Sequence, residues 1–205
     1  MRPETGNNNP SADNNKVSIR LESGGHSFSA EALPDELRNP QTEALFEVVT
    51  HKTLLIPSEL FEHDNAARYL AVAGLACRPD ETALTAEKEG MTAVMAVSSK
   101  MLNAIRPHFG ERAAFTSPLL ELENGGGREL RIALYGDVSY FKLSDDGRLR
   151  FAEALRTVDF DEILYCLHIL DERFGLAAYH IYICGDGAAD TASRVKKYFR
   201  KVKCE

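Results

Sequence analysis

The clearest hydrophobic pattern lies between residues 130 and 186. Apolar runs at 130–135, 139–143 and 149–152 have the length of strands, and Asp145-Asp146-Gly147 separates the last two. An Asp-Gly turn between β-patterned segments is typical of a hairpin. The pattern therefore predicts three consecutive strands.

The period of the apolar residues changes after these strands. Between Phe160 and Phe174 they recur every three or four positions, which predicts a helix. Asp159 followed by Glu162 is typical of a helix N-cap, and Gly175 marks the end. The run 180–184 then fits a buried strand. A strand that returns soon after a helix indicates parallel pairing and an α/β layer.

The N-terminal part shows shorter patterns. Runs 17–21 and 27–30 flank Ser23-Gly24-Gly25, which predicts a hairpin, and runs 45–49 and 53–56 predict two more strands. Pro57 is expected to open a helix that contains Leu60 and Leu70, with Ser58 as its cap.

Further along, runs 82–86 and 91–97 predict strands paired around Lys88-Glu89-Gly90. Ser98 is expected to begin a helix, and Phe115 to lie in another strand. The glycine-rich loop 123–127 then separates the two patterned regions.

These patterns predict two halves, residues 17–123 and 128–205, after a disordered tail at 1–16. The tail is rich in Asn, Pro, Ser and Gly and has almost no apolar residues, so it cannot repay its ordering entropy. Both halves begin with strands and continue into helices. This order indicates a structural duplication in an α/β protein with mixed sheets.

Composition and charge argue against several classes of protein. With 205 residues, 44% of them hydrophobic, the chain can bury a substantial core. A net charge of -7 argues against wholesale binding to nucleic acid or to an anionic membrane. No apolar run reaches the roughly 20 residues that span a bilayer, and the cysteines form no CxxC pair. We expect a cytoplasmic protein without a membrane span.

Segments 17–21, 27–29, 55–61 and 161–165 closely resemble a bacterial family of unknown function. Its members look like compact, degenerate relatives of the actin-like ATPases, which include cell-division and pilus-assembly proteins. The resemblance covers nearly all of residues 17–205. It implies an RNase H-like (actin-like ATPase) fold with two similar α/β halves.

The same resemblance gives a check on catalysis. Active relatives place Asp-x-Gly in the first strand of each half, where the carboxylate organises Mg²⁺ and the following turn cradles phosphate. Here Leu134 falls at the Asp position of the second half and Gly136 at the Gly position. The corresponding run in the first half, 18–21, contains no carboxylate. The resemblance therefore implies a pseudo-ATPase that holds no metal.

A third element offers a candidate ligand contact. The turn Gly185-Asp186-Gly187 resembles the glycine-rich turn that packs on adenosine in active relatives. Glycines permit close approach of a ligand, but they also build tight strand-to-helix turns. Two interpretations stay open: a nucleotide contact that needs no Mg²⁺, or a purely structural turn.

The sequence contains no recognisable catalytic constellation. A two-metal nuclease would need convergent carboxylates, for which Asp137, Asp159, Asp161 and Asp186 are the candidates. The first strand of the second half supplies none, and Asp159 and Asp161 are better explained by the start of a helix. There is no Gly-x-Ser-x-Gly elbow, and the histidines lack zinc-protease spacing. The sequence predicts no catalytic residue and no metal ligand.

The last twelve residues are unusually basic and hold six of the 24 Lys and Arg. Together with Val195, Tyr198, Phe199 and Val202 they predict an amphipathic terminal helix with a solvated basic face. The alternative for this face is docking of an acidic partner or RNA.

The resulting hypothesis is a non-catalytic, actin-like scaffold or assembly protein with a protein partner or self-association. One alternative is a nucleotide-binding regulator that does not hydrolyse. Another is a nucleic-acid-associated protein that uses the basic C-terminal helix.

Overall fold

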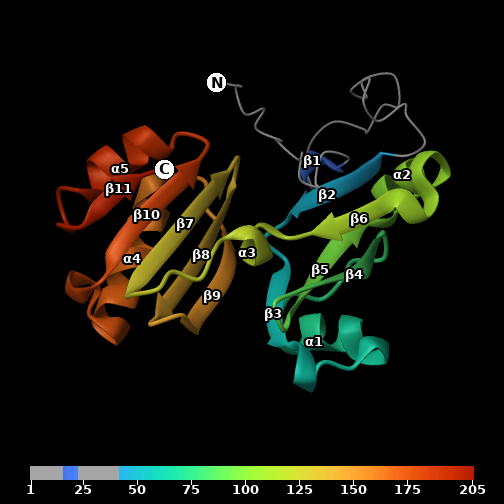
Figure 1. Cartoon of the computed structure of the whole chain (residues 1–205), viewed down its shortest axis with the longest axis horizontal. Coiled ribbons are helices and arrows are strands. Elements are labelled where there is room, and N and C mark those ends of the chain that lie inside the picture. Colours follow the sequence, from blue (N-terminus) through green and yellow to red (C-terminus); the bar gives the residue numbers. More distant parts are fainter. Residues whose placement is uncertain (1–15, 23–41) are drawn as a thin grey trace, which may run out of the picture.

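The strands of the described residues form three sheets, which lie in two parts side by side (Figure 1). The computed structural model describes residues 16–22 and 42–205. The C-terminal part contains one five-stranded sheet, and the N-terminal part contains two three-stranded sheets. The short helix α3 (Pro118–Glu121) lies between the two parts and contacts strands of all three sheets.

The five-stranded sheet is mixed. It has the order β11-β10-β7-β8-β9. Strands β7 to β9 pair antiparallel, whereas β10 pairs in parallel with both β7 and β11. The strands are β7 (Glu129–Tyr135), β8 (Val138–Asp145), β9 (Arg148–Arg156), β10 (His180–Gly185) and β11 (Val202–Cys204). The predicted strands and the parallel return after the helix are confirmed.

Helices α4 (Phe160–Phe174) and α5 (Ala188–Val195) share a core with one face of this sheet. Asp159 caps α4 by accepting hydrogen bonds from the backbone N–H groups of Asp161 and Glu162, at 3.0 and 3.1 Å. Gly175 ends the helix in the left-handed conformation, with φ of 68°. Both predicted ends of this helix are therefore confirmed.

One sheet of the N-terminal part is entirely parallel. It has the order β1-β2-β6, from β1 (Lys16–Glu22), β2 (Glu43–Val49) and β6 (Ala113–Thr116). Helix α2 (Ser99–Phe109) buries Leu102, Ile105 and Phe109 in the core of this region. The predicted strands at 17–21 and 45–49 and the helix after Ser98 are confirmed. The run 27–30, and the tail up to residue 15, lie outside the described residues.

The other N-terminal sheet is antiparallel and has the order β3-β5-β4. Its strands are β3 (Thr53–Pro57), β4 (Glu81–Lys88) and β5 (Met91–Ser98), and helix α1 (Ala66–Val72) packs on it. The hairpin predicted around Glu89-Gly90 is confirmed.

The prediction that a helix begins at Pro57 is wrong. Pro57 ends β3, and two 3₁₀ turns, Ser58–Leu60 and His63–Asn65, precede α1. Ser58 caps no helix, because its backbone N–H donates to the Gly90 carbonyl at 2.8 Å and its hydroxyl pairs with that of Thr92 at 2.9 Å. The Ser58 hydroxyl, which a cap would have used, is instead engaged with Thr92 of β5.

The predicted basic C-terminal helix is also wrong. Helix α5 ends at Val195, and Val202–Cys204 form β11 at the edge of the sheet. Ile181 donates its N–H to the Lys201 carbonyl at 2.8 Å, and Val202 is buried. Strand pairing to β10 satisfies backbone groups that a helix would have paired internally, and it also buries Val202. The continuous basic helix face on which a nucleic-acid role depended does not exist.

Within the described part of the chain, no helix is long and apolar enough to span a bilayer.

Candidate functional site

The ends of strands from both parts meet around the turn after β10. Arg20 of β1 and Glu47 of β2 come from the N-terminal part, and they are direct neighbours in the parallel register. Tyr135 ends β7, and Asp186 follows β10, so both belong to the C-terminal part. We call these four residues, with the backbone of Gly136, the bridging cluster.

Gly185 is required by the packing of β10 against β7. Its φ is +91°, and a Cβ atom at this position would overlap the carbonyl oxygen of Leu134. The next backbone N–H, that of Asp186, donates to the same carbonyl at 2.8 Å. Gly187 also has a positive φ, of 67°, but no atom would oppose its Cβ within 4 Å. Of these two glycines, Gly185 is therefore the one fixed by a close approach of the backbone to itself.

The Asp186 carboxylate sits against the turn between β7 and β8. One oxygen accepts a hydrogen bond from the backbone N–H of Gly136 at 3.1 Å. The other lies 3.4 Å from Nη1 of Arg20. One side chain thus joins the second-half turn to the first strand of the N-terminal part.

Arg20 is the centre of the cluster. Its guanidinium lies 4.1 Å from the centroid of the Tyr135 ring, a cation–π distance, and its Nε lies 3.8 Å from the Glu47 carboxylate. The Tyr135 hydroxyl donates to the same carboxylate at 3.5 Å. Each charged group of the cluster therefore faces an opposite charge or a polar partner across the boundary between the two parts.

Burial sets the protonation of two of these groups. It raises the pKa of Glu47 above its ordinary value, and the positive charge of Arg20 opposes that rise. Burial also raises the pKa of Tyr135, to about 12, and the negative charge of Glu47 adds to it. Tyr135 is thus a neutral hydrogen-bond donor across the physiological range.

Beneath the cluster the two parts share an apolar core. Val49 of β2, Leu119 of α3 and Tyr140 of β8 are buried in it. The Tyr140 hydroxyl donates to the Thr50 carbonyl at 3.1 Å and accepts from the Thr50 N–H at 2.8 Å. Because this core contains buried side chains from both parts and the Tyr140 hydroxyl is paired within it, the two parts form one packed unit.

The residues expected at metal positions are not suited to a cation. Leu134 is buried at the position of the relatives' carboxylate, and Asp137 is ion-paired with Arg156 at 2.8 Å. Asp159 is engaged in the cap of α4. Across residues 16–22 and 42–205, no group of three or more His, Cys, Asp or Glu could hold a metal ion.

Asp186 was singled out from the sequence, whereas Arg20, Glu47 and Tyr135 were not. The opposite charges of Arg20 and Glu47 become neighbours only through the register of β1 on β2, which no local pattern reveals. The expectation that Gly185, Asp186 and Gly187 contact a nucleotide stays a prediction.

Comparison with known proteins identifies the fold. The chain is similar to a Bacteroides thetaiotaomicron protein described as having an actin-like ATPase fold and unknown function, with 16% identity and a TM-score of 0.70 over 84% of this chain and 72% of that one. This likeness confirms the actin-like ATPase fold, and at that identity it shows the fold alone. No protein-family model and no curated sequence matches the chain.

Two further solved structures are more distantly similar. The PilM-PilN type IV pilus biogenesis complex matches with 12% identity and a TM-score of 0.47, over 80% of this chain and 69% of that one. The cytoplasmic domain of EpsL, an inner-membrane component of the Vibrio cholerae type II secretion system, matches with 13% identity and a TM-score of 0.42, over 93% and 85%. At these scores neither likeness carries an argument.

Proposed function

We propose that this protein is a non-catalytic, actin-like scaffold that acts through protein partners or self-association in the cytoplasm. The observation that carries the proposal is the position of Asp186. Its carboxylate accepts a hydrogen bond from the backbone N–H of Gly136. This N–H lies in the turn whose counterpart cradles phosphate in active relatives. A negatively charged side chain of the protein itself thus takes a donor that a phosphate would need.

Two further observations support the loss of hydrolysis. Leu134 replaces the carboxylate that would organise Mg²⁺, and a buried leucine side chain offers a metal ion no ligand. The contacts of Arg20 with Asp186 and Tyr135 join the two parts directly through side chains of the protein itself.

An ATP hydrolysis assay tests the proposal. Phosphate release from millimolar ATP with Mg²⁺ should equal that of a protein-free control. Turnover that is lost in Asp186→Asn, with folding retained by circular dichroism, would overturn it.

A regulator that binds nucleotide without hydrolysis is the second candidate. It is favoured by the open space beside Gly187 and by the Asp186 side chain, which is 54% exposed. Such a ligand would have to displace the Asp186 carboxylate from the Gly136 N–H. Competition for this donor makes the scaffold the better-supported proposal.

A further inference from the structure

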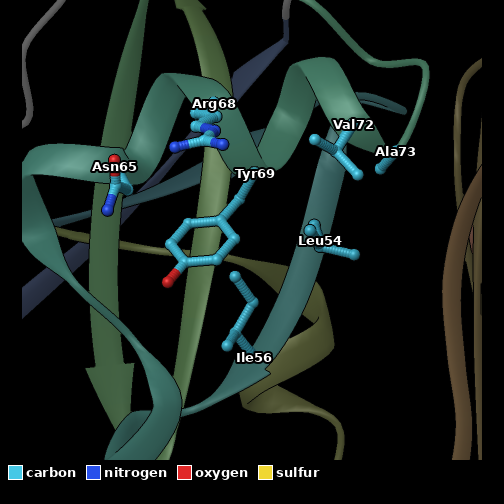
Figure 2. A pocket seen from close by; sticks show the side chains of 7 residues that line it. All are labelled: Leu54, Ile56, Asn65, Arg68, Tyr69, Val72 and Ala73. Atoms are coloured by element: carbon cyan, nitrogen blue, oxygen red, sulfur yellow. The ribbon is translucent and has the colours of Figure 1, made fainter.

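An apolar groove lies between α1 and the edge strand β3, away from the bridging cluster. It has a volume of about 450 Å³. Leu54 and Ile56 of β3 form one wall, and Arg68, Tyr69 and Val72 of α1 form the other (Figure 2). Figure 2 shows the Tyr69 ring lying between the helix and Ile56, with Val72 and Leu54 further along the groove.

The rim of the groove exposes large apolar side chains. Val72 is 82% exposed, and Leu60 is 65% exposed. Leu60 is tied to the groove because its carbonyl accepts a hydrogen bond from the Tyr69 hydroxyl at 3.2 Å. Exposed apolar side chains grouped around a concave surface are typical of a protein-binding site.

The groove carries one cation without a partner. Among the described residues, Arg68 makes no hydrogen bond or ion pair. By contrast, the nearby acid Glu62 is held by the Asn65 side-chain amide, at the N-terminal end of the helix. In a chain with a net charge of -7, a free guanidinium on an apolar surface selects for a carboxylate.

We propose that this groove binds a short segment of a partner protein that carries two apolar residues and one acidic residue. The apolar side chains enter the space between Tyr69, Val72 and Leu54, and the carboxylate meets Arg68. A volume of this size accommodates side chains rather than a whole folded surface, which favours a linear segment as the occupant. The inference deepens the proposed scaffold function and rests on it for the class of ligand.

Selection from a phage-displayed library of random 12-residue peptides tests the groove. Enriched peptides should contain two apolar residues and an Asp or Glu. Their dissociation constants should rise at least tenfold for Val72→Glu and for Arg68→Glu. Val158→Glu is the matched control, because Val158 is 73% exposed on the other part of the molecule, and it should leave binding unchanged.

Three results would overturn the inference: no enriched peptide, enriched peptides that bind both groove variants as tightly as wild type, or enriched peptides without acidic residues. A concentration-dependent dimer that Val72→Glu abolishes would assign the groove to a second copy of this chain instead. None of these results bears on ATP turnover, so failure here is distinguishable from failure of the proposed function.

Discussion

The Asp186 carboxylate accepts a hydrogen bond from the backbone N–H of Gly136 at 3.1 Å, and so holds the turn after β7 against the turn after β10. The same carboxylate faces Arg20 of the other part of the molecule at 3.4 Å. A single side chain therefore contributes to the fold of one part and to its attachment to the other.

Replacing this side chain should loosen the attachment only slightly. Asp186→Ala is expected to lower the free energy of unfolding by about 1 kcal/mol, because the carboxylate is half exposed and its ion pair is screened by solvent. Urea denaturation measures the change. Glu172→Ala, at an exposed position near the C-terminal end of α4, is the control and should not destabilise. Equal losses in both variants would contradict a bridging role for Asp186.

Gly185 should tolerate substitution far less well than other glycines with positive φ. Gly185→Ala combines an unfavourable φ with overlap of its Cβ and the Leu134 carbonyl, so a loss of about 3 kcal/mol or more is expected. Gly147→Ala has a φ of +76° but open space around it, and should lose only about 1–2 kcal/mol. Thermal unfolding of the two variants compares them. A smaller loss for Gly185→Ala would show that β10 does not approach β7 as described.

Removing the buried Tyr140 hydroxyl should lower the free energy of unfolding more than removing an exposed tyrosine hydroxyl. Tyr140→Phe leaves the buried N–H of Thr50 without its partner, whereas the Thr50 carbonyl keeps the hydrogen bond from the Thr53 hydroxyl, so a cost of about 1–3 kcal/mol is expected. Tyr165→Phe, at a 67% exposed position, should be neutral. Chemical denaturation of both variants would reveal the difference, and a neutral Tyr140→Phe would argue against the shared core.

Tyr135 should make the free energy of unfolding depend on pH in the alkaline range. Its pKa in the folded protein is raised to about 12, whereas an unfolded tyrosine titrates near about 10. The folded state thus keeps a proton that the unfolded state loses, so the free energy of unfolding falls as pH rises from about 10 to 12. Urea melts across this range should show a shallower decline for Tyr135→Phe. Identical slopes would mean that the phenol is not shielded.

Local periodicity predicted the elements whose ends are defined by local chemistry. The α4 helix, with its Asp159 cap and Gly175 stop, is an example, and so is the β4–β5 hairpin. Failures occurred where distant hydrogen bonds decided the outcome. Ser58 bonds to Gly90 and Thr92 rather than capping a helix, and residues 202–204 pair with β10 although their apolar spacing also fits a helix.

For the candidate site, too, the sequence predicted local features and missed contacts between distant segments. The sequence indicated Asp186 because glycines flank it. The fold explains one of these glycines, since Gly185 has a positive φ and packs closely against Leu134. The sequence could not reveal Arg20, Glu47 and Tyr135, since their meeting depends on the parallel register of β1 on β2 and on the packing of two parts of the chain. Contacts between segments that are distant along the chain leave no local periodicity.

The most direct test of the account is a thermal-shift titration with ATP, ADP and GTP, each with and without Mg²⁺. A ligand that binds only the folded state must raise the melting temperature by mass action. Because Asp186 already occupies the Gly136 N–H, the account predicts no shift at millimolar nucleotide. A saturable rise with any of the three, reduced in a Gly187→Asn variant that still unfolds cooperatively, would contradict it and assign the turn after β10 to nucleotide binding.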